Sequence, residues 1–409
     1  MKKMLSLAAM FAVLSYASPA SAELKIGGDA STRLRGEFNN KETVGTPKTD
    51  RGGDDLKYSY KVRLKASADL GDGYFFKALV ANEELVAGSS PGWATVAGNN
   101  GEKFQLELSN FYFGRSLDNC HYQVGRLPLN SLNNPIFDLT LYPVPGRINS
   151  LGTKVYAVDV PVYQYNYDRV FGINYGSKVG NGDLNATLVV LDNNSTIEHT
   201  GVPNATGDGL FNDGYLLHLA YKTNIGNVTV EPQALITLTD AQGPTYQKVS
   251  PNTFGANATI PAGKSKIGLS GFYTVCKDHL GSSTPLIKNT AIQDPTQAAI
   301  PAYIAGTTKP VNVDYRGYLV RLKGESGPVT AWVDYNHTTD KSSGTGLTEQ
   351  KYNNLFVWAQ YKVNVHESSL GTVSLTPTVR YRASAQDGTA GTTSRDNQLR
   401  TELYATVTF

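Results

Sequence analysis

The sequence predicts an antiparallel β-barrel that spans a membrane, with about sixteen strands; fourteen and eighteen are the alternative counts. Three observations predict it. Apolar and polar residues alternate with a period of two through segments longer than the ~5–6 residues usual in soluble sheets. The connections between these segments are short and long in turn, with residues 39–55 and 385–397 among the long ones, as in barrels of the outer membrane. The last segment, residues 399–409, keeps the alternation and ends on an aromatic residue.

Composition excludes other classes of protein. The 409 residues are 40% hydrophobic and 18% charged, with a mean hydropathy of -0.29. A bundle of membrane helices would need spans of ~20 apolar residues, and a disordered chain would hold fewer apolar residues. Two cysteines are too few for a disulfide scaffold.

The N-terminal residues predict an exported protein. Residues 1–22 contain two lysines, an apolar run and a small-residue site before Glu23, which is the pattern of a cleaved signal peptide. Residues 23–409 are then expected to form one barrel domain. They carry 35 basic and 35 acidic residues, so no nucleic-acid partner is expected.

The first two segments show the alternation most clearly. In residues 24–38 apolar side chains share one parity and charged side chains the other, and residues 56–70 repeat this arrangement. A strand points alternate side chains to opposite faces, whereas a helix would spread these charges over every face. Weaker copies recur along the chain, and residues 252–260 are counted as a weak strand because the order of short and long connections requires one there. A soluble sandwich or β-helix is the alternative interpretation of the alternation.

Closing the barrel would bring the last strand beside the first and gather basic residues of the polar parity on one wall. The basic residues of the first three strands and the last two strands are Lys25, Arg33, Arg35, Lys57, Lys61, Arg63, Lys65, Lys77, Arg380, Arg382 and Arg400. The acidic residues of this parity are fewer: Asp29, Glu37, Asp69, Glu107 and Glu402. Charged side chains inside a narrow pore select ions by sign. The wall therefore favours anions, unless its charges only solvate the lumen and pair with Asp29 and Glu37.

Two short motifs resemble the general porins of Gram-negative bacteria. They are Asn-Phe-Tyr-Phe-Gly-Arg at 110–115 and Tyr-Gln-Val-Gly-Arg at 122–126, followed by a long connection with Pro-Ile-Phe-Asp at 135–138. The resemblance implies a trimeric, water-filled diffusion channel whose long third loop is folded into the lumen. It also implies that Arg126 is the wall arginine beside the constriction and that Asp138 is the opposing carboxylate on the loop.

The predicted function is a passive outer-membrane channel for small hydrophilic solutes and ions, with a preference for anions. The alternative is a substrate-specific channel, or a sheath barrel that encloses a partner such as an electron-transfer cytochrome. Expected partners are outer-membrane lipid and lipopolysaccharide, two further copies of the chain in a homotrimer, and solutes in transit. No catalytic motif, metal-ligand spacing or cofactor motif is found, so no enzyme activity is expected. The predicted pore-lining and constriction residues are Arg33, Arg35, Lys61, Arg63, Lys65, Arg126, Asp138, Arg380 and Arg382.

Overall fold

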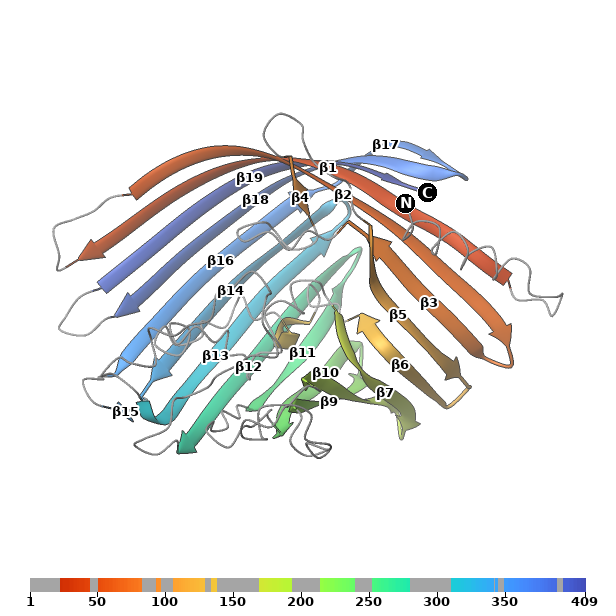
Figure 1. Ribbon diagram of the computed structural model, residues 1–409, viewed down its shortest axis with the longest axis horizontal. Helices are drawn as coiled ribbons and strands as arrows, with labels where there is room; N and C mark the ends of the chain where they lie inside the picture. The colour runs from red at the N-terminus through yellow and green to blue at the C-terminus, as the bar shows by residue number, and fades with distance from the viewer. Residues whose placement is uncertain are drawn as a thin grey trace, which may run out of the picture.

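A computed structural model shows a closed antiparallel β-barrel (Figure 1). The structure describes residues 23–44, 51–82, 93–96, 106–128, 134–137, 169–192, 214–239, 252–279, 310–341, 343–344, 349–387 and 393–409. Residues 1–22, which hold the predicted signal peptide, lie outside this part of the chain. Within it, sixteen long strands form the wall, and three short strands, β4, β15 and β17, add to it.

The strands of the first half are β1 (Glu23–Val44), β2 (Arg51–Gly71), β3 (Tyr74–Ala81), β4 (Ala94–Thr95), β5 (Glu107–Ser116), β6 (Cys120–Pro128), β7 (Arg169–Val179), β8 (Gly182–Asp192) and β9 (Gly214–Ile225). Those of the second half are β10 (Val228–Thr239), β11 (Asn252–Ala262), β12 (Ser265–His279), β13 (Pro310–Ser326), β14 (Val329–Asp340), β15 (Ser343–Gly344), β16 (Gln350–Tyr361), β17 (Val363–Ser368), β18 (Gly371–Asp387) and β19 (Thr393–Thr408). One short 3-10 helix, η2 (Pro135–Phe137), is described.

Each long strand pairs with its neighbours in the sequence, and β1 closes the barrel by pairing with both β2 and β19. In Figure 1 the first strands, in red and orange, lie beside the last strands, in blue. The final residue completes the seam, because the backbone N–H of Phe409 donates to the carbonyl of Gly28 at 3.1 Å and the N–H of Gly28 donates to the carbonyl of Phe409 at 2.8 Å. The pairing leaves no strand edge open along this seam. An open edge would expose unpaired backbone N–H and C=O groups to lipid, which cannot form hydrogen bonds with them.

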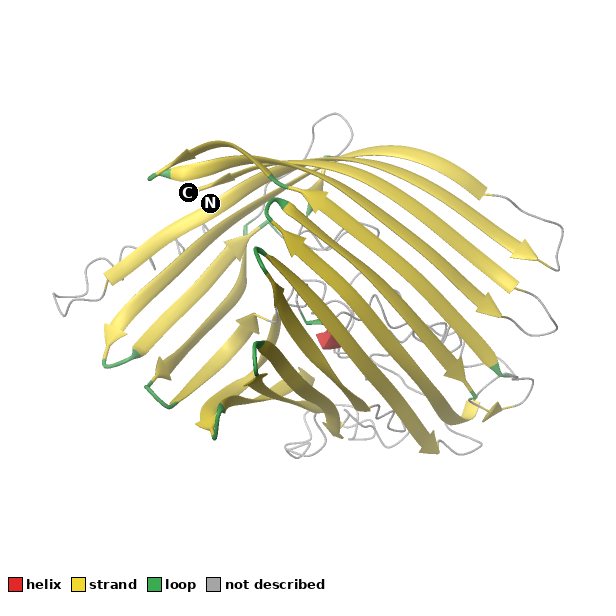
Figure 2. Cartoon of the chain, turned by 180° about the vertical axis from the view of Figure 1, so that it is seen from behind, coloured by secondary structure: helices red, strands yellow, loops and turns green. Residues whose placement is uncertain are grey.

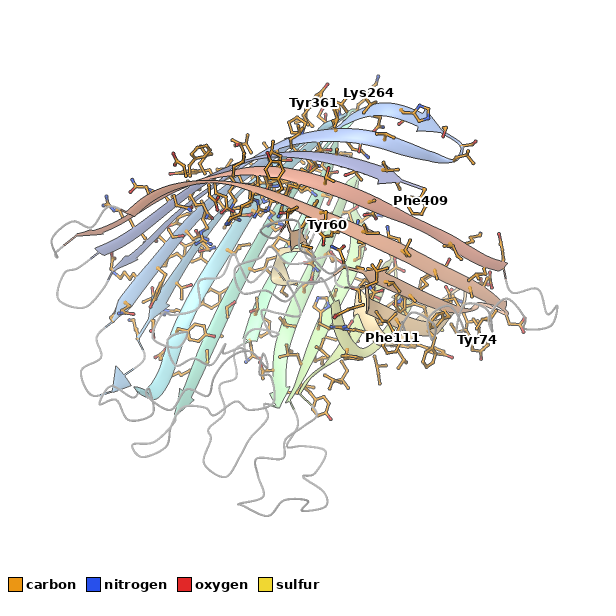
Figure 3. The ribbon with its side chains drawn as sticks, turned by 45° about the horizontal axis from the view of Figure 1, so that its top comes forward. Tyr60, Tyr74, Phe111, Lys264, Tyr361 and Phe409 are labelled. Carbon is orange, nitrogen blue, oxygen red and sulfur yellow. The ribbon has the colours of Figure 1, made fainter. Side chains whose placement is uncertain are left out.

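The burial of side chains follows the predicted alternation. Charged residues are buried and apolar residues are exposed, which is the reverse of a soluble protein. On β1, Arg33 and Arg35 are 3% and 4% exposed, whereas Leu34 between them is 37% exposed. The outer face carries aromatic residues at many positions, among them Tyr74, Tyr361 and Phe409, which lie on the outside of the wall in Figure 3. An apolar exterior around a polar interior is the arrangement of a transmembrane barrel.

Tight turns join the strands at one end of the barrel, where Figure 2 shows them in green. The turn between β2 and β3 has positive φ at three successive residues, Gly71 (85°), Asp72 (51°) and Gly73 (79°). The backbone N–H of Gly71 also donates to the carboxylate of Asp69 at 3.0 Å. Glycine tolerates such φ values without a steric penalty, so the sequence at these positions fixes where the strands reverse.

The predicted weak strand at 252–260 is confirmed as β11, but two predicted connections are shorter than expected. We expected residues 39–55 and 385–397 to be loops, whereas β1 continues to Val44, β2 begins at Arg51 and β18 continues to Asp387. These ends are polar on both faces, so hydropathy alone does not mark them as strands. They are held by backbone pairing, such as Lys41 with Arg51 and with Asp396.

The described part of the third long connection lies inside the barrel, as predicted. Ile136 of η2 is 1% exposed and belongs to an inward-facing apolar cluster. The side chain of Asn134 donates to Gln233 of β10 at 2.9 Å and accepts from Asn257 of β11 at 3.1 Å. The other cluster residues are Leu127, Val170, Val189, Leu216, Leu235, Phe272 and Leu319. This connection is therefore anchored on the inner side of β6–β13.

In the part of the chain that the structure describes, no helix has both the length and the hydropathy required to span a membrane.

Candidate functional site

The candidate site is a cluster of charged side chains on the inner face of β18, β19, β1 and β2. The strand register brings them together, because Glu402 of β19 lies opposite Arg35 of β1, and Arg400 lies opposite Glu37. On the other flank, Arg400 lies opposite Arg380 of β18. Alternation puts every second residue of each strand on this face. Cations and acids from four strands therefore form one patch.

Glu402 is the centre of the first half of the cluster. Its side chain is 0% exposed and contacts three arginines: the Oε1 atom lies 2.5 Å from Nε of Arg35 and 3.7 Å from NH1 of Arg33, and the Oε2 atom lies 2.7 Å from Nε of Arg380. The hydroxyl of Tyr404 donates to Glu402 at 2.6 Å and accepts from Arg380 at 2.8 Å. One buried carboxylate thus holds three guanidinium groups together.

Glu37 is the centre of the second half. Its Oε1 atom lies 3.2 Å from NH1 of Arg35 and 3.0 Å from Nε of Arg400. Its Oε2 atom accepts from the ammonium of Lys57 at 2.8 Å. Arg35 joins the two halves, since it contacts both carboxylates. We call Glu37, Glu402 and the cations around them, Arg33, Arg35, Lys57, Arg380 and Arg400, the charge cluster.

A smaller group lies further along β1 and β2. The Nε of Arg63 lies 2.9 Å from Asp29, and the ammonium of Lys65 lies 3.5 Å from it. Lys61 and Arg33 approach the indole of Trp93, at 4.8 and 4.4 Å from its centroid. The segment that carries Trp93 is held by β4, which pairs with β2 at Ser59 and Tyr60. These contacts extend the basic wall from the charge cluster along β2.

The charge cluster contains five cations and two carboxylates, and burial separates them into two layers. Glu37, Glu402, Arg33 and Arg35 are at most 5% exposed in their side chains, and their four charges cancel. Lys57, Arg380 and Arg400 are 36%, 30% and 29% exposed. The accessible charge facing the interior is therefore positive. A positive wall in a narrow water-filled space raises the local concentration of anions.

The structure places most of the predicted site residues on this face, with two exceptions. Arg33, Arg35 and Arg380 belong to the charge cluster, and Lys61, Arg63 and Lys65 lie beside it on β2. Arg382 shares the inward parity of β18 and lies opposite Gln398. Asp138 lies outside the described residues.

Arg126 was expected beside the constriction, and this expectation is wrong. It lies on the outer face, opposite Phe171, with its guanidinium 5.5 Å from the centroid of that ring, which is 43% exposed. The next residue, Leu127, faces inward and packs in the cluster of Ile136. The inner face is apolar at this point, so the assumption that polar residues face inward assigns the wrong parity.

Sequence reasoning missed the central role of Glu402 and left Lys57 and Arg400 out of the predicted set. Glu402 shares the parity of the arginines, but only the register between β19 and β1 shows that it sits among them. Trp93 was missed as well, because it comes from a connection rather than from an alternating segment. Within the described residues, no group of three or more His, Cys, Asp or Glu side chains could hold a metal ion.

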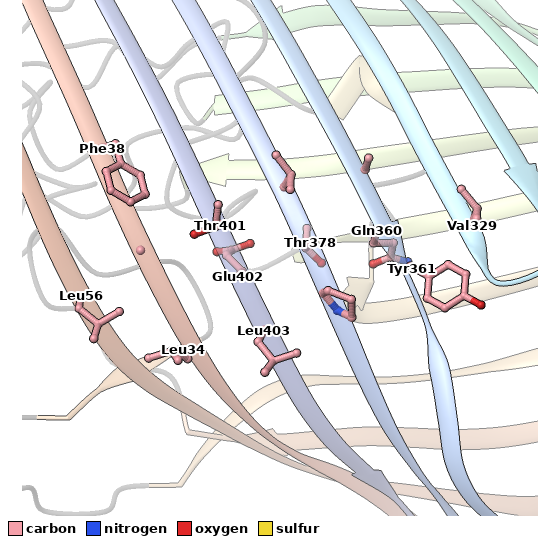
Figure 4. A pocket seen from close by; sticks show the side chains of 14 residues that line it. Leu34, Phe38, Leu56, Val329, Gln360, Tyr361, Thr378, Thr401, Glu402 and Leu403 are labelled. Atoms are coloured by element: carbon pink, nitrogen blue, oxygen red, sulfur yellow. The ribbon is translucent and has the colours of Figure 1, made fainter.

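A separate groove of about 650 Å³ crosses β16, β18, β19, β1 and β2 (Figure 4). Its rim includes Leu34, Phe38, Leu56, Tyr361 and Leu403, whose side chains point outward and are 37% to 57% exposed. Its lining also includes Gly36, which has no side chain, and Ala359, which has a small one. The groove therefore lies on the apolar outside of the barrel, behind the charge cluster.

No protein-family model matches the chain, and no curated protein matches its sequence. Solved structures with a similar fold include the outer membrane channel DcaP of Acinetobacter baumannii, with 13% identity over 96% of this chain and 99% of that chain and a TM-score of 0.47. OmpT, an outer membrane protein of Vibrio cholerae described as a trimer, is 11% identical over 94% of this chain and 99% of that one, with a TM-score of 0.46. A BenF-like porin from Pseudomonas fluorescens is 13% identical over 93% and 99%, with a TM-score of 0.44. These low values assign neither a family nor a solute to this chain.

Proposed function

We propose that the barrel is a water-filled channel for passive diffusion of small hydrophilic solutes and ions across the outer membrane of a Gram-negative bacterium, and that it prefers anions. The observation that carries this proposal is the layering of the charge cluster. The buried carboxylates of Glu37 and Glu402 are balanced by Arg33 and Arg35, while Lys57, Arg380 and Arg400 keep accessible positive charge. Barrels of ~16 strands are wide enough to leave an aqueous channel.

We propose that residues 1–22 are removed on export, so that the mature chain begins at Glu23 and forms one barrel domain. Lipid and lipopolysaccharide then contact its outer face, and three copies associate. The apolar outer groove supports close association, because small residues such as Gly36 and Ala359 let another surface approach the wall. No catalytic step is part of the proposal.

Electrical recording in planar lipid bilayers tests the channel and its selectivity together. We expect stepwise conductance and, in a KCl gradient, a reversal potential of the sign given by chloride permeation. The variant Arg380→Gln/Arg400→Gln should lose most of this preference, because it removes two of the accessible cations. Lys264→Gln, which neutralises a lysine in the turn between β11 and β12, should leave the potential unchanged. Silent membranes, or a clear preference for potassium in the native protein, would contradict the proposal.

A further inference from the structure

The tryptophans of this barrel lie on its inner face. The chain has three, Trp93, Trp332 and Trp358. Trp332 and Trp358 share the inward parity of β14 and β16 and are 5% and 7% exposed, while Val333 beside Trp332 is 42% exposed on the outside. Trp93 contacts the inward-facing residues Arg33, Lys61 and Tyr404. Tryptophan in membrane proteins is usually enriched at the outer interfaces with the lipid headgroups. Its placement inside the barrel therefore calls for another reason.

The strand register sets two of these indoles in one row with the cations of the wall. Trp332 lies directly opposite Lys323 of β13 on one side and Trp358 of β16 on the other. Trp358 in turn lies opposite Arg380 of β18, and Arg380 lies opposite Arg400 of β19. The row therefore reads cation, two indoles, two cations, across five neighbouring strands on the inner face.

The contacts within this row are those of a stacked aromatic pair flanked by positive charge. The rings of Trp332 and Trp358 are stacked, with centroids 3.9 Å apart and planes inclined by 21°. The guanidinium of Arg321 lies 5.1 Å from the ring centroid of Trp332, and the ammonium of Lys323 lies 6.0 Å from it. The buried indole Nε1–H of Trp332 donates no hydrogen bond within the described part of the chain. The row thus sets a stacked aromatic pair between positively charged side chains.

We propose that this row, which we call the aromatic–basic row, binds planar aromatic carboxylates in the lumen. The inference rests on the proposed channel and names a solute class for it. Aromatic rings attract one another in stacked or edge-to-face geometry, worth ~0.5–1.5 kcal/mol beyond the area they bury. A guanidinium binds a carboxylate through parallel hydrogen bonds, and Arg380 and Arg400 are the accessible cations next to Trp358. A solute that carries both groups matches both halves of the row, whereas acetate or a neutral ring matches only one.

Four probe solutes separate the two halves of the row. Benzoate carries the ring and the charge, cyclohexanecarboxylate carries the charge on a ring without π electrons, acetate carries the charge alone, and benzyl alcohol carries the ring without the charge. In bilayer recordings with chloride as the carried ion, we expect benzoate to reduce the current at concentrations about fivefold lower than cyclohexanecarboxylate or acetate do. Benzyl alcohol should have no effect over the same range.

Two variants and a control connect this preference to the row. Trp358→Leu should bring the half-blocking concentration of benzoate to that of cyclohexanecarboxylate. Arg380→Lys keeps the charge but loses the planar guanidinium, and should weaken block by all three carboxylates. Phe272→Leu changes an inward aromatic residue of the apolar cluster around Ile136, outside the row, and should leave the preference intact. Equal block by benzoate and cyclohexanecarboxylate in the native protein, or an unchanged preference in Trp358→Leu, would overturn the inference.

Tryptophan fluorescence of the protein in detergent provides a readout that needs no current. Because all three tryptophans lie in the lumen, benzoate binding should change the emission and cyclohexanecarboxylate should change it less, and Trp358→Leu should abolish the difference. If the protein shows this difference but never conducts, the binding role of the aromatic–basic row is supported and the proposed channel is wrong. If the protein conducts but does not distinguish benzoate from cyclohexanecarboxylate, in current or in fluorescence, the channel is supported and the binding role of the aromatic–basic row is wrong.

Discussion

At the residue scale, Glu402 is the group on which the basic wall depends. It is fully buried and contacts Arg33, Arg35 and Arg380 within 3.7 Å. Glu402→Gln would leave these guanidinium groups to repel one another, and losing one partner of a buried ion pair costs ~3–5 kcal/mol. We therefore expect the urea midpoint for unfolding from phospholipid vesicles to fall, with a loss of about 3 kcal/mol in the free energy of unfolding.

The matched control is Glu23→Gln. The pair between Glu23 and Lys25 spans 3.3 Å, but both side chains are 69% exposed. Exposed ion pairs contribute ~1 kcal/mol or less, so the midpoint should hardly move. If the two variants shift the midpoint equally, Glu402 does not hold the wall together in the way its contacts indicate.

The residue scale also shows where sequence reasoning works and where it stops. Alternation correctly places Arg33, Arg35 and Arg380 on the inner face, because the period of two is a property of each strand alone. It assigns Arg126 to the wrong face, because the inner face at this point is apolar: Leu127 belongs to the inward cluster that is built from many strands. Which acid neutralises which arginine depends on pairing between the two ends of the chain, and no local pattern encodes it.

At the scale of elements, the third connection is anchored by Ile136 of η2, which is 1% exposed in the inward apolar cluster. Ile136→Ala should loosen this anchor, because removing a buried isoleucine side chain to alanine costs ~2–5 kcal/mol. We expect a larger single-channel conductance with more current noise. Leu34→Ala, on the outer face, is the control and should leave the conductance unchanged. Native conductance in Ile136→Ala would show that this contact does not limit the pore.

The turn between β2 and β3 provides a second prediction at this scale. Gly73 has a φ of 79°, and a Cβ atom there would also meet the carbonyl oxygen of Ser116. Gly73→Ala should therefore lower the free energy of unfolding by at least ~1 kcal/mol. Gly53→Ala on β2 is the control, because a Cβ atom there has no neighbour within 4 Å. Equal urea midpoints for the two variants would contradict the strain assigned to this turn.

Elements were predicted well where two signals agree. Strands bounded by glycine-rich turns and alternating in hydropathy were found in order, including the weak strand β11. The extensions of β1 and β2 into residues 39–55 were missed, because a strand that projects out of the bilayer has water on its outer face and no longer needs apolar residues there. Short strands such as β4 and β15 have two residues each and give no periodic signal.

At the scale of the whole molecule, closure of the barrel creates the site. The two ends of the chain meet along β1 and β19, and this seam joins cations of the first strands to Glu402 near the C-terminus. The same closure places the aromatic–basic row next to the charge cluster, since Arg380 and Arg400 belong to both. The site is therefore a surface that no single segment of the chain contains.

The barrel as a whole requires that the polar face of each strand lines the lumen and that the apolar face contacts lipid. Nitroxide labels at residues 57, 58, 64 and 65 of β2, introduced one at a time in a cysteine-free background and reconstituted in lipid, test it directly. We expect labels that replace Tyr58 and Leu64 to be relaxed mainly by oxygen dissolved in the bilayer. Labels that replace Lys57 and Lys65 should be relaxed mainly by a water-soluble nickel chelate. Label accessibility that does not alternate along the strand, or relaxation by the nickel chelate of labels at the apolar positions, would contradict this arrangement.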